Sequence, residues 1–185
     1  MPPRSELTIA VAIVIAGFGL GWGIVATLSG STHATSPSSV EQGSPPPDVP
    51  APGPLFVMIA GRNLTVLAFL LSGLFTFGLM SAAVLAHNGF ALGGLIRNSL
   101  AMGMEPNILA GLILPHGVLE LAAFVLAGAL GLRGWSLGRD AVRSGRWEFA
   151  GVRTTTVVSV AAIVVAAVIE STITRHILLT TALGR

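Results

Sequence analysis

Long apolar segments separated by short polar ones make up most of this 185-residue chain. The first apolar run extends from Leu7 to Leu28 and the second from Leu64 to Ala86, and two more cover residues 107–132 and 154–174. Each approaches or exceeds the roughly 20 residues with which a helix crosses a hydrocarbon core of about 30 Å. The pattern therefore predicts an all-α protein, a polytopic bundle of transmembrane helices.

Residues 90–104 fit this pattern less well, because the segment is short for a span and contains Arg97, Asn98 and three glycines. We interpret it as a third, tightly packed helix, with a re-entrant segment as the alternative. The turn-forming residues Asn88 and Gly89 come just before it and predict a tight turn after the second span. The predicted fold thus has about five spans, one of them short or re-entrant-like.

The chain divides into three predicted parts. Residues 1–28 form an N-terminal transmembrane helix, in which the spacing of Gly17 and Gly21 permits the close approach of another helix. A cleaved signal peptide is the alternative, although its apolar core usually has only about 7–15 residues. Residues 29–54 are rich in Ser and Pro and too polar to form a core, so we expect an extracytoplasmic loop. Residues 55–185 form the membrane bundle.

Composition supports a protein surrounded by lipid. Hydrophobic residues make up 52% of the chain and charged residues only 10%, whereas a soluble domain has roughly 25% charged residues. The net charge of +2, without a clustered basic face, excludes a nucleic-acid partner. Cysteine is absent, which excludes disulfides and thiolate metal sites.

Arginine positions predict the orientation in the cell membrane. Five of the ten basic residues, all of them arginine, lie between residues 133 and 153, with Trp135 and Trp147 among them. The positive-inside rule places this connector in the cytoplasm, as an amphipathic segment at the level of the lipid headgroups. With five spans, the N-terminus is then cytoplasmic and the C-terminus extracytoplasmic.

Ionisable residues inside the spans mark the candidate site, because each costs about 2.5–3.5 kcal/mol to insert and needs a partner within the bundle. His116 and Glu120 are four residues apart and so share one helix face. Pro115 and Gly117 beside them predict a break or kink in this helix. Such a pair closes a buried hydrogen-bonded network, relays a proton or binds a cation. Since a zinc site needs three or four ligands, we predict no metal and no cofactor.

Arg97 and Glu170 complete the predicted buried polar network. Arg97 lies inside the third span and needs an acidic partner, which Glu120 or Glu170 would supply. Glu170 is near the outer end of the last span, where an ion pair with Arg175 or Arg62 is the alternative.

Catalytic signatures are missing from the sequence, including HExxH, the serine elbow, the phosphate loop and the dinucleotide fingerprint. We therefore expect no enzymatic activity. Asn63 begins a glycosylation sequon, but it lies at a predicted membrane edge and serves equally well as a helix cap.

The chain resembles the stage II sporulation protein M family over roughly residues 55–177. The specific part of the resemblance is the Pro-His-Gly-x-x-Glu block within Leu114–Leu121, and weaker support comes from His87-Asn88-Gly89, Gly93-Gly94 and Ala166–Glu170. The resemblance implies a multi-span protein of the cell membrane. In spore formers it implies an anchor and organiser for two secreted wall-cutting proteins.

Three functions compete at this stage. The main hypothesis is a non-enzymatic scaffold or assembly partner for envelope proteins, whose partner is a membrane or envelope protein or a second copy of the chain. The alternative is a transporter or permease-like subunit that uses His116 and Glu120. It predicts a water-accessible cavity at His116, whereas the scaffold predicts a dry, fully paired network. An intramembrane hydrolase is third, and it requires Glu170 or His87 to converge on His116.

Overall fold

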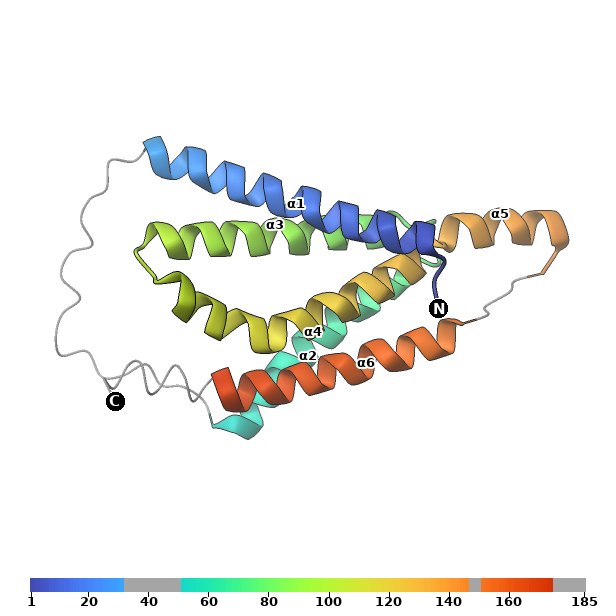
Figure 1. Ribbon diagram of the computed structural model, residues 1–185. Coiled ribbons are helices and arrows are strands. Elements are labelled where there is room, and N and C mark those ends of the chain that lie inside the picture. Colours follow the sequence, from blue (N-terminus) through green and yellow to red (C-terminus); the bar gives the residue numbers. More distant parts are fainter. Residues whose placement is uncertain (32–50, 147–150, 175–185) are drawn as a thin grey trace.

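The computed structural model describes residues 1–31, 51–146 and 151–174, and these residues form helices joined by short connections. The helices, shown in Figure 1, are α1 Arg4–Ser31, α2 Pro52–Ser72, α3 Leu79–Ala101, α4 Pro106–Leu132, α5 Gly134–Ser144 and α6 Val152–Ile169, followed by a π-helical segment, Glu170–Thr174. Five helices are long and apolar enough to cross a membrane, namely α1, α2, α3, α4 and α6. The predicted all-α fold with about five spans is confirmed.

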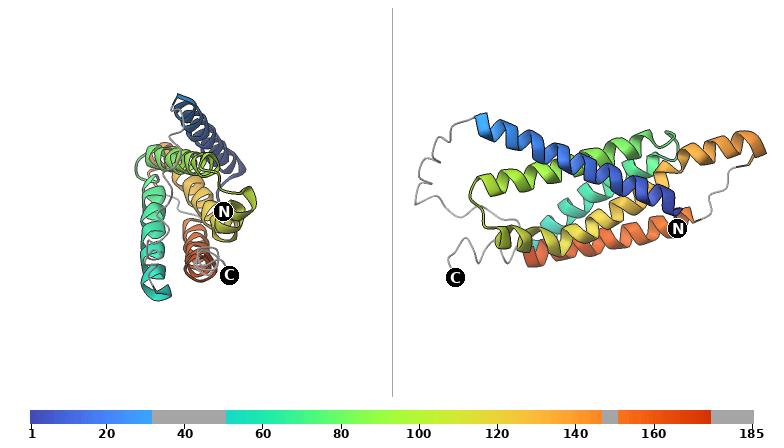
Figure 2. Two further views of the ribbon diagram at one scale, coloured as in Figure 1. Left: turned by 90° about the vertical axis from the view of Figure 1, so that its left-hand side faces the viewer. Right: turned by 45° about the horizontal axis from the view of Figure 1, so that its top comes forward.

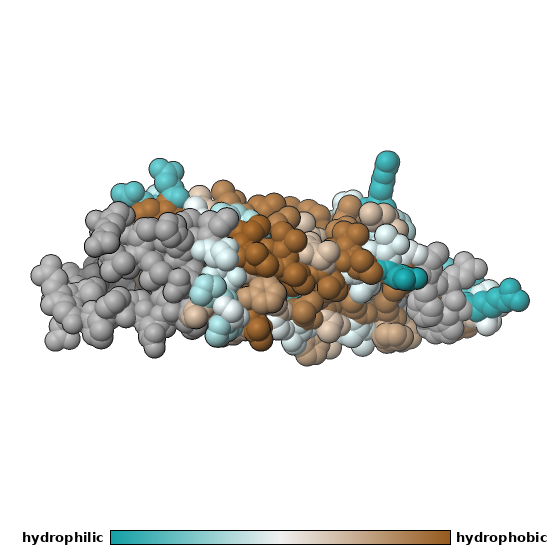
Figure 3. All heavy atoms as spheres, turned by 90° about the horizontal axis from the view of Figure 1, so that it is seen from below, coloured by the Kyte–Doolittle hydropathy of each residue, from teal (hydrophilic) through white to brown (hydrophobic). Residues whose placement is uncertain are grey.

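The spanning helices run side by side along the length of the molecule (Figures 1 and 2). Apolar side chains cover the middle of the face seen in Figure 3, and hydrophilic ones gather toward its ends. This is the distribution that a bilayer selects, because side chains at the level of the hydrocarbon core contact lipid instead of water. The end at which α1 begins also holds α5 and the start of α6 (Figure 1).

The predicted second span, 64–86, is wrong in its boundaries. The structure divides these residues between α2 and α3, with a turn at residues 73–78. Phe77 and Gly78 adopt positive φ angles there, 53° and 85°, and so turn the chain back. The turn is itself apolar, so hydropathy does not distinguish it from a helix. α2 accordingly starts at Pro52, where proline suits the first turn of a helix.

The predicted turn at Asn88 and Gly89 is also wrong, because both residues lie inside α3. A Cβ atom at Gly89 would lie closer than 3.0 Å to the backbone oxygen of Val14 in α1. Gly89 therefore serves helix packing instead of a turn. The segment 90–104 is not a separate short span, since most of it forms the second half of α3.

Glycines hold α1 against α3, the neighbour with which it packs most extensively (Figures 1 and 2). A Cβ atom at Gly17 would lie closer than 3.0 Å to the carbonyl oxygen of Ala86, and one at Gly21 would clash with that of Phe90. The spacing of these glycines predicts close approach of another helix, and α3 is that helix.

The predicted loop at residues 29–54 lies mostly outside the described residues. α1 extends to Ser31, and α2 includes residues 52–54, so each end of the predicted loop is helical. Residues 32–50 are not described, and neither are Trp147 and Arg175.

α4 is the central helix, with contacts to α1, α2, α3 and α6. It is continuous through Pro115 and Gly117, so the predicted break is absent. The helix instead changes direction along its length (Figure 1), as expected where a proline removes one internal hydrogen bond. Small residues such as Ala123 and Ala127 are fully buried and bring the neighbouring helices close to its second half. His116 and Glu120 lie in the part of α4 just before this tight contact.

Candidate functional site

A pocket of about 620 Å³ lies between α2, α3, α4 and the end of α6. Its wall combines apolar side chains, such as Ile59 and Phe124, with seven polar ones. The polar residues are Arg62, Asn63, His87, Asn88, His116, Glu120 and Glu170. A cavity of this size exceeds what one water molecule requires. Its polar lining distinguishes it from the apolar contacts between the helices.

His116 and Glu120 enter the pocket from α4. Their spacing of four residues places them on one face of the helix, as the sequence indicates. The side chain of His116 is mostly buried, with 13% of its surface exposed. Both residues are partly buried and line the pocket.

Glu170 reaches the same place from α6. Its Oε2 atom lies 3.9 Å from Nε2 of His116. It is the first residue of the π-helical segment Glu170–Thr174, where the helix is wider than in α6. Single π-helical turns occur frequently at functional sites.

Asn63 of α2 is a site residue that the sequence analysis missed. Its side-chain amide donates a hydrogen bond to Oε1 of Glu120. It is buried in the middle of α2, so its predicted role as a helix cap is wrong. The neighbouring Arg62 made the pair look like a membrane boundary. The sequence did contain a signal for Asn63. The residue lies about one helical turn before the apolar run Val66–Leu71, which indicates a position inside a spanning helix.

His87 and Asn88 also line the pocket, on α3. The amide of Asn88 donates to the carbonyl oxygen of Val84, a bond within its own helix. His87 has an exposed side chain and lies outside the cluster of three titratable residues described next.

Three titratable side chains converge on one point of the pocket. One ligand atom each from His116, Glu120 and Glu170 can be chosen so that all three lie within 4.8 Å of one another. The sequence predicted no metal because His116 and Glu120 supply only two ligands from one helix. In the structure, Glu170 adds a third possible ligand from another helix. The arrangement is therefore able to bind a cation or to pass a proton between a carboxylate and an imidazole.

Arg97 does not take part in this cluster. In the described residues, ion pairs within 4 Å join His116 to Glu170 and Arg139 to Asp140. Arg97 lies ten residues beyond His87 along α3, which corresponds to about 15 Å at 1.5 Å per residue. The predicted pairing of Arg97 with Glu120 or Glu170 is not formed. Arg62, the alternative partner of Glu170, lines the pocket with an exposed side chain.

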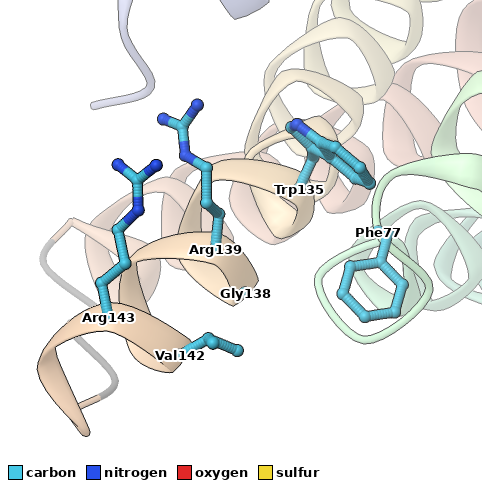
Figure 4. Close-up of a pocket in the computed structure, with 6 residues that line it drawn as sticks. All are labelled: Phe77, Trp135, Gly138, Arg139, Val142 and Arg143. Carbon is cyan, nitrogen blue, oxygen red and sulfur yellow. The ribbon is translucent and has the colours of Figure 1, made fainter.

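A second, shallower pocket of about 290 Å³ lies at the other end of the bundle, against α5. Figure 4 shows Arg139 and Arg143 side by side on α5, pointing away from Val142 and the ring of Phe77. Trp135 packs edge-on against Phe77 and is 65% exposed. α5 is thus amphipathic, as predicted for this connector, and it lacks a titratable cluster like that around His116.

The family model of stage II sporulation protein M matches residues 10–175. The chain belongs to this family. The match includes most of α1, and so begins well before the resemblance over residues 55–177 that the motifs indicate. Together with the five apolar helices, membership of the stage II sporulation protein M family makes the chain a multi-pass membrane protein.

One relative is an uncharacterized protein of Methanocaldococcus jannaschii. It is 38% identical over 79 residues, which cover 42% of this chain and 44% of the relative. The chain therefore matches less than half of the relative's length. No solved structure matches the chain.

Proposed function

We propose that this member of the stage II sporulation protein M family is a permease-like membrane subunit that binds a small cation or a proton in the polar pocket. The observation that carries the proposal is the pocket of about 620 Å³ whose wall includes His116, Glu120 and Glu170. A cavity at His116 is the feature that separates the permease hypothesis from a scaffold with a dry polar core.

The depth of the site supports the proposal. His116 is ten residues from the start of α4 at Pro106, or about 15 Å along the helix. Many carriers bind their substrates near the middle of the membrane, beside helices whose regular hydrogen bonding is interrupted. Pro115 removes one hydrogen bond from the otherwise continuous α4, and the π-helical segment after Ile169 changes the hydrogen bonding at the end of α6. Both irregularities adjoin the pocket.

The ionisable residues in the pocket wall also support the permease proposal. An ionisable residue within a span costs about 2.5–3.5 kcal/mol on insertion. Replacing a buried ion pair with apolar residues of similar volume is often neutral or stabilising. A purely structural role therefore does not explain two glutamates and a histidine that face an open pocket, whereas binding of a cation or proton does.

We also propose an orientation with the N-terminus in the cytoplasm. Arg4 at the start of α1 and the arginines of α5 lie at the same end of the bundle (Figure 1), and the positive-inside rule assigns this end to the cytoplasm. The end of α6 lies at the opposite end of the bundle, and by the same rule we propose an extracytoplasmic C-terminus. No step of this function requires catalysis, so we propose that the chain is not an enzyme.

A scaffold is the second candidate function, and α5 is the observation that favours it. This helix follows α4 directly and projects from the end of the bundle (Figure 1), with Trp135, Arg139 and Val142 exposed. Its surface would receive a membrane or envelope protein, or a second copy of the chain.

Cysteine labelling tests the permease proposal, because the chain has no cysteine of its own. Ala91→Cys places a thiol in the pocket, on α3. Val118→Cys is the matched control, because Val118 is 59% exposed on α4 and does not line the pocket, so it faces lipid. A charged, water-soluble methanethiosulfonate reagent should modify Ala91→Cys rapidly and Val118→Cys slowly. Equal slow reaction of both thiols would contradict a water-accessible pocket and favour the scaffold.

A further inference from the structure

The donor atoms around His116 form a set that is suited to a metal ion. An imidazole and two carboxylates come from α4 and the end of α6, and their ligand atoms lie within 4.8 Å of one another. Metal sites that also bind water or a substrate usually have three protein ligands and one open coordination position. The adjoining pocket supplies this space.

The separation between the groups leaves room for an intervening ion. Nε2 of His116 and Oε2 of Glu170 are 3.9 Å apart, longer than the roughly 2.7–3.2 Å of an N–H···O hydrogen bond. Ligand atoms at 2.0–2.1 Å from a tetrahedral ion are about 3.3 Å from one another. A small side-chain rotation brings the two atoms from the observed separation to this one.

The charges also favour a divalent cation. As metal ligands, two ionised carboxylates and a neutral imidazole carry a charge of −2, which a single dication neutralises. In the described residues neither Glu120 nor Glu170 forms an ion pair with an arginine within 4 Å, although Arg62 lines the same pocket. An uncompensated charge inside a membrane is costly, and a dication between the two carboxylates would supply the counter-charge.

The imidazole narrows the choice of ion. Mg²⁺ and Ca²⁺ select oxygen ligands, whereas histidine suits zinc, iron and the other first-row transition metals. The amide of Asn63 bonds to Glu120 and orients its carboxylate, which is the usual role of a residue that supports a metal ligand.

We infer that His116, Glu120 and Glu170 bind one divalent first-row transition-metal ion. We identify this ion with the cation that the permease would transport, and only this identification rests on the proposed function. Asn63 is a positioning residue for Glu120 and not itself a ligand in this arrangement.

The test is a Co²⁺ titration of the full-length protein, purified with a tag that contains no histidine, stripped of metal and placed in lipid nanodiscs. Visible absorption reports Co²⁺ bound by protein ligands, and one ion per chain is expected. Because losing a supporting residue weakens metal sites about 10–100-fold, losing a direct ligand should weaken Co²⁺ binding at least about 100-fold. Glu170→Gln and His116→Gln remove direct ligands, and Asn63→Ala removes the supporting amide.

His87→Gln is the matched control, because His87 lines the same pocket but lies outside the three-residue cluster. It should bind Co²⁺ as the unaltered protein does. Glu170→Gln replaces a side chain that is 30% exposed, and its thermal unfolding shows directly whether it is folded. Absence of Co²⁺ binding by the unaltered protein, or full binding by folded Glu170→Gln and His116→Gln, would overturn the inference.

A flux measurement separates the metal site from the permease function. Proteoliposomes that enclose a metal-sensing dye report Co²⁺ entry, and those that enclose a pH dye report proton entry. Co²⁺ binding without flux of either ion leaves the metal site standing and overturns the permease. Proton flux without Co²⁺ binding supports the permease and overturns the metal site.

Discussion

His116 on α4 and Glu170 at the end of α6 bring an imidazole nitrogen and a carboxylate oxygen to within 3.9 Å of each other. The two residues belong to different spanning helices, and α4 packs along α6 over much of its length. Any relative movement of α4 and α6 therefore changes this separation. A ligand between the two groups would join the helices, and its loss would release them.

The amide of Asn63 should contribute measurably to stability, because it donates a hydrogen bond to the carboxylate of Glu120. Asn63→Leu removes the donor and leaves that carboxylate facing an apolar side chain. Loss of one partner from a buried polar pair costs about 1–3 kcal/mol. We expect a lower midpoint of thermal unfolding in detergent.

The control is Thr65→Ala on the same helix. Thr65 is exposed and its hydroxyl donates only to the carbonyl oxygen of Gly61. This variant should unfold at nearly the temperature of the unaltered protein. If Asn63→Leu does the same, the bond from Asn63 to Glu120 has no structural importance.

The contact between α1 and α3 should tolerate no side chain at Gly21. A Cβ atom there would lie closer than 3.0 Å to the backbone of Phe90. Overpacking of this kind typically costs 1–3 kcal/mol, so Gly21→Ala should lower the unfolding midpoint. Gly19→Ala is a close control, since a Cβ atom at Gly19 meets nothing within 4 Å. Alanine also favours helix over glycine, so Gly19→Ala should be neutral or stabilising. Equal effects of the two substitutions would show that α1 does not pack on α3 through this face.

Hydropathy predicted about five spans, one of them short or re-entrant-like, but not all of their limits. The average hydropathy over about 20 residues measures how readily a segment partitions into lipid. It does not indicate where the chain reverses direction within an apolar stretch. The turn at residues 73–78 contains Leu74, Phe75 and Phe77, so it partitions like the helices on either side. Asn88 and Gly89, by contrast, are typical turn residues that the structure uses within a helix.

Local spacing accounts for only part of the predicted site, since Glu170 was assigned to it because an ionisable residue in a span needs a partner. The shared face of His116 and Glu120 follows from helix geometry within one segment. The bond from Asn63 joins α2 to α4, and a contact between segments leaves no trace in the periodicity of either one. Arg97 was assigned to the network because a cation buried in a span requires an acidic partner. This requirement does not say where in the bundle the residue lies. On α3, Arg97 is about 15 Å along the helix from His87.

Buried hydroxyl groups should fall into two classes. The hydroxyl of Ser81 is fully buried and donates to the carbonyl oxygen of Leu70 at 2.6 Å. Ser81→Ala should therefore cost about 1 kcal/mol. The hydroxyl of Ser159 is fully buried and has no hydrogen-bond partner. Ser159→Ala should be neutral or stabilising, because it removes a polar atom that is unsatisfied in the folded state. Thermal unfolding in detergent distinguishes these outcomes, and a reversed order would contradict the hydrogen-bonding pattern of the bundle.

The proposed orientation predicts which end of the bundle a membrane-impermeant reagent reaches in intact cells. Met102, in the turn between α3 and α4, is 79% exposed, and Ser144, the last residue of α5, is exposed as well. The two residues lie at opposite ends of the bundle, because the spanning helix α4 separates them along the chain. Met102→Cys should be modified by an impermeant maleimide on intact cells, and Ser144→Cys should be modified only in inverted membrane vesicles. Because both positions are exposed and Ser144 lies outside the apolar face of α5, a difference between them reports membrane side and not burial. The reverse pattern would place the arginines of α5 outside the cell, and the positive-inside rule would then fail for this chain.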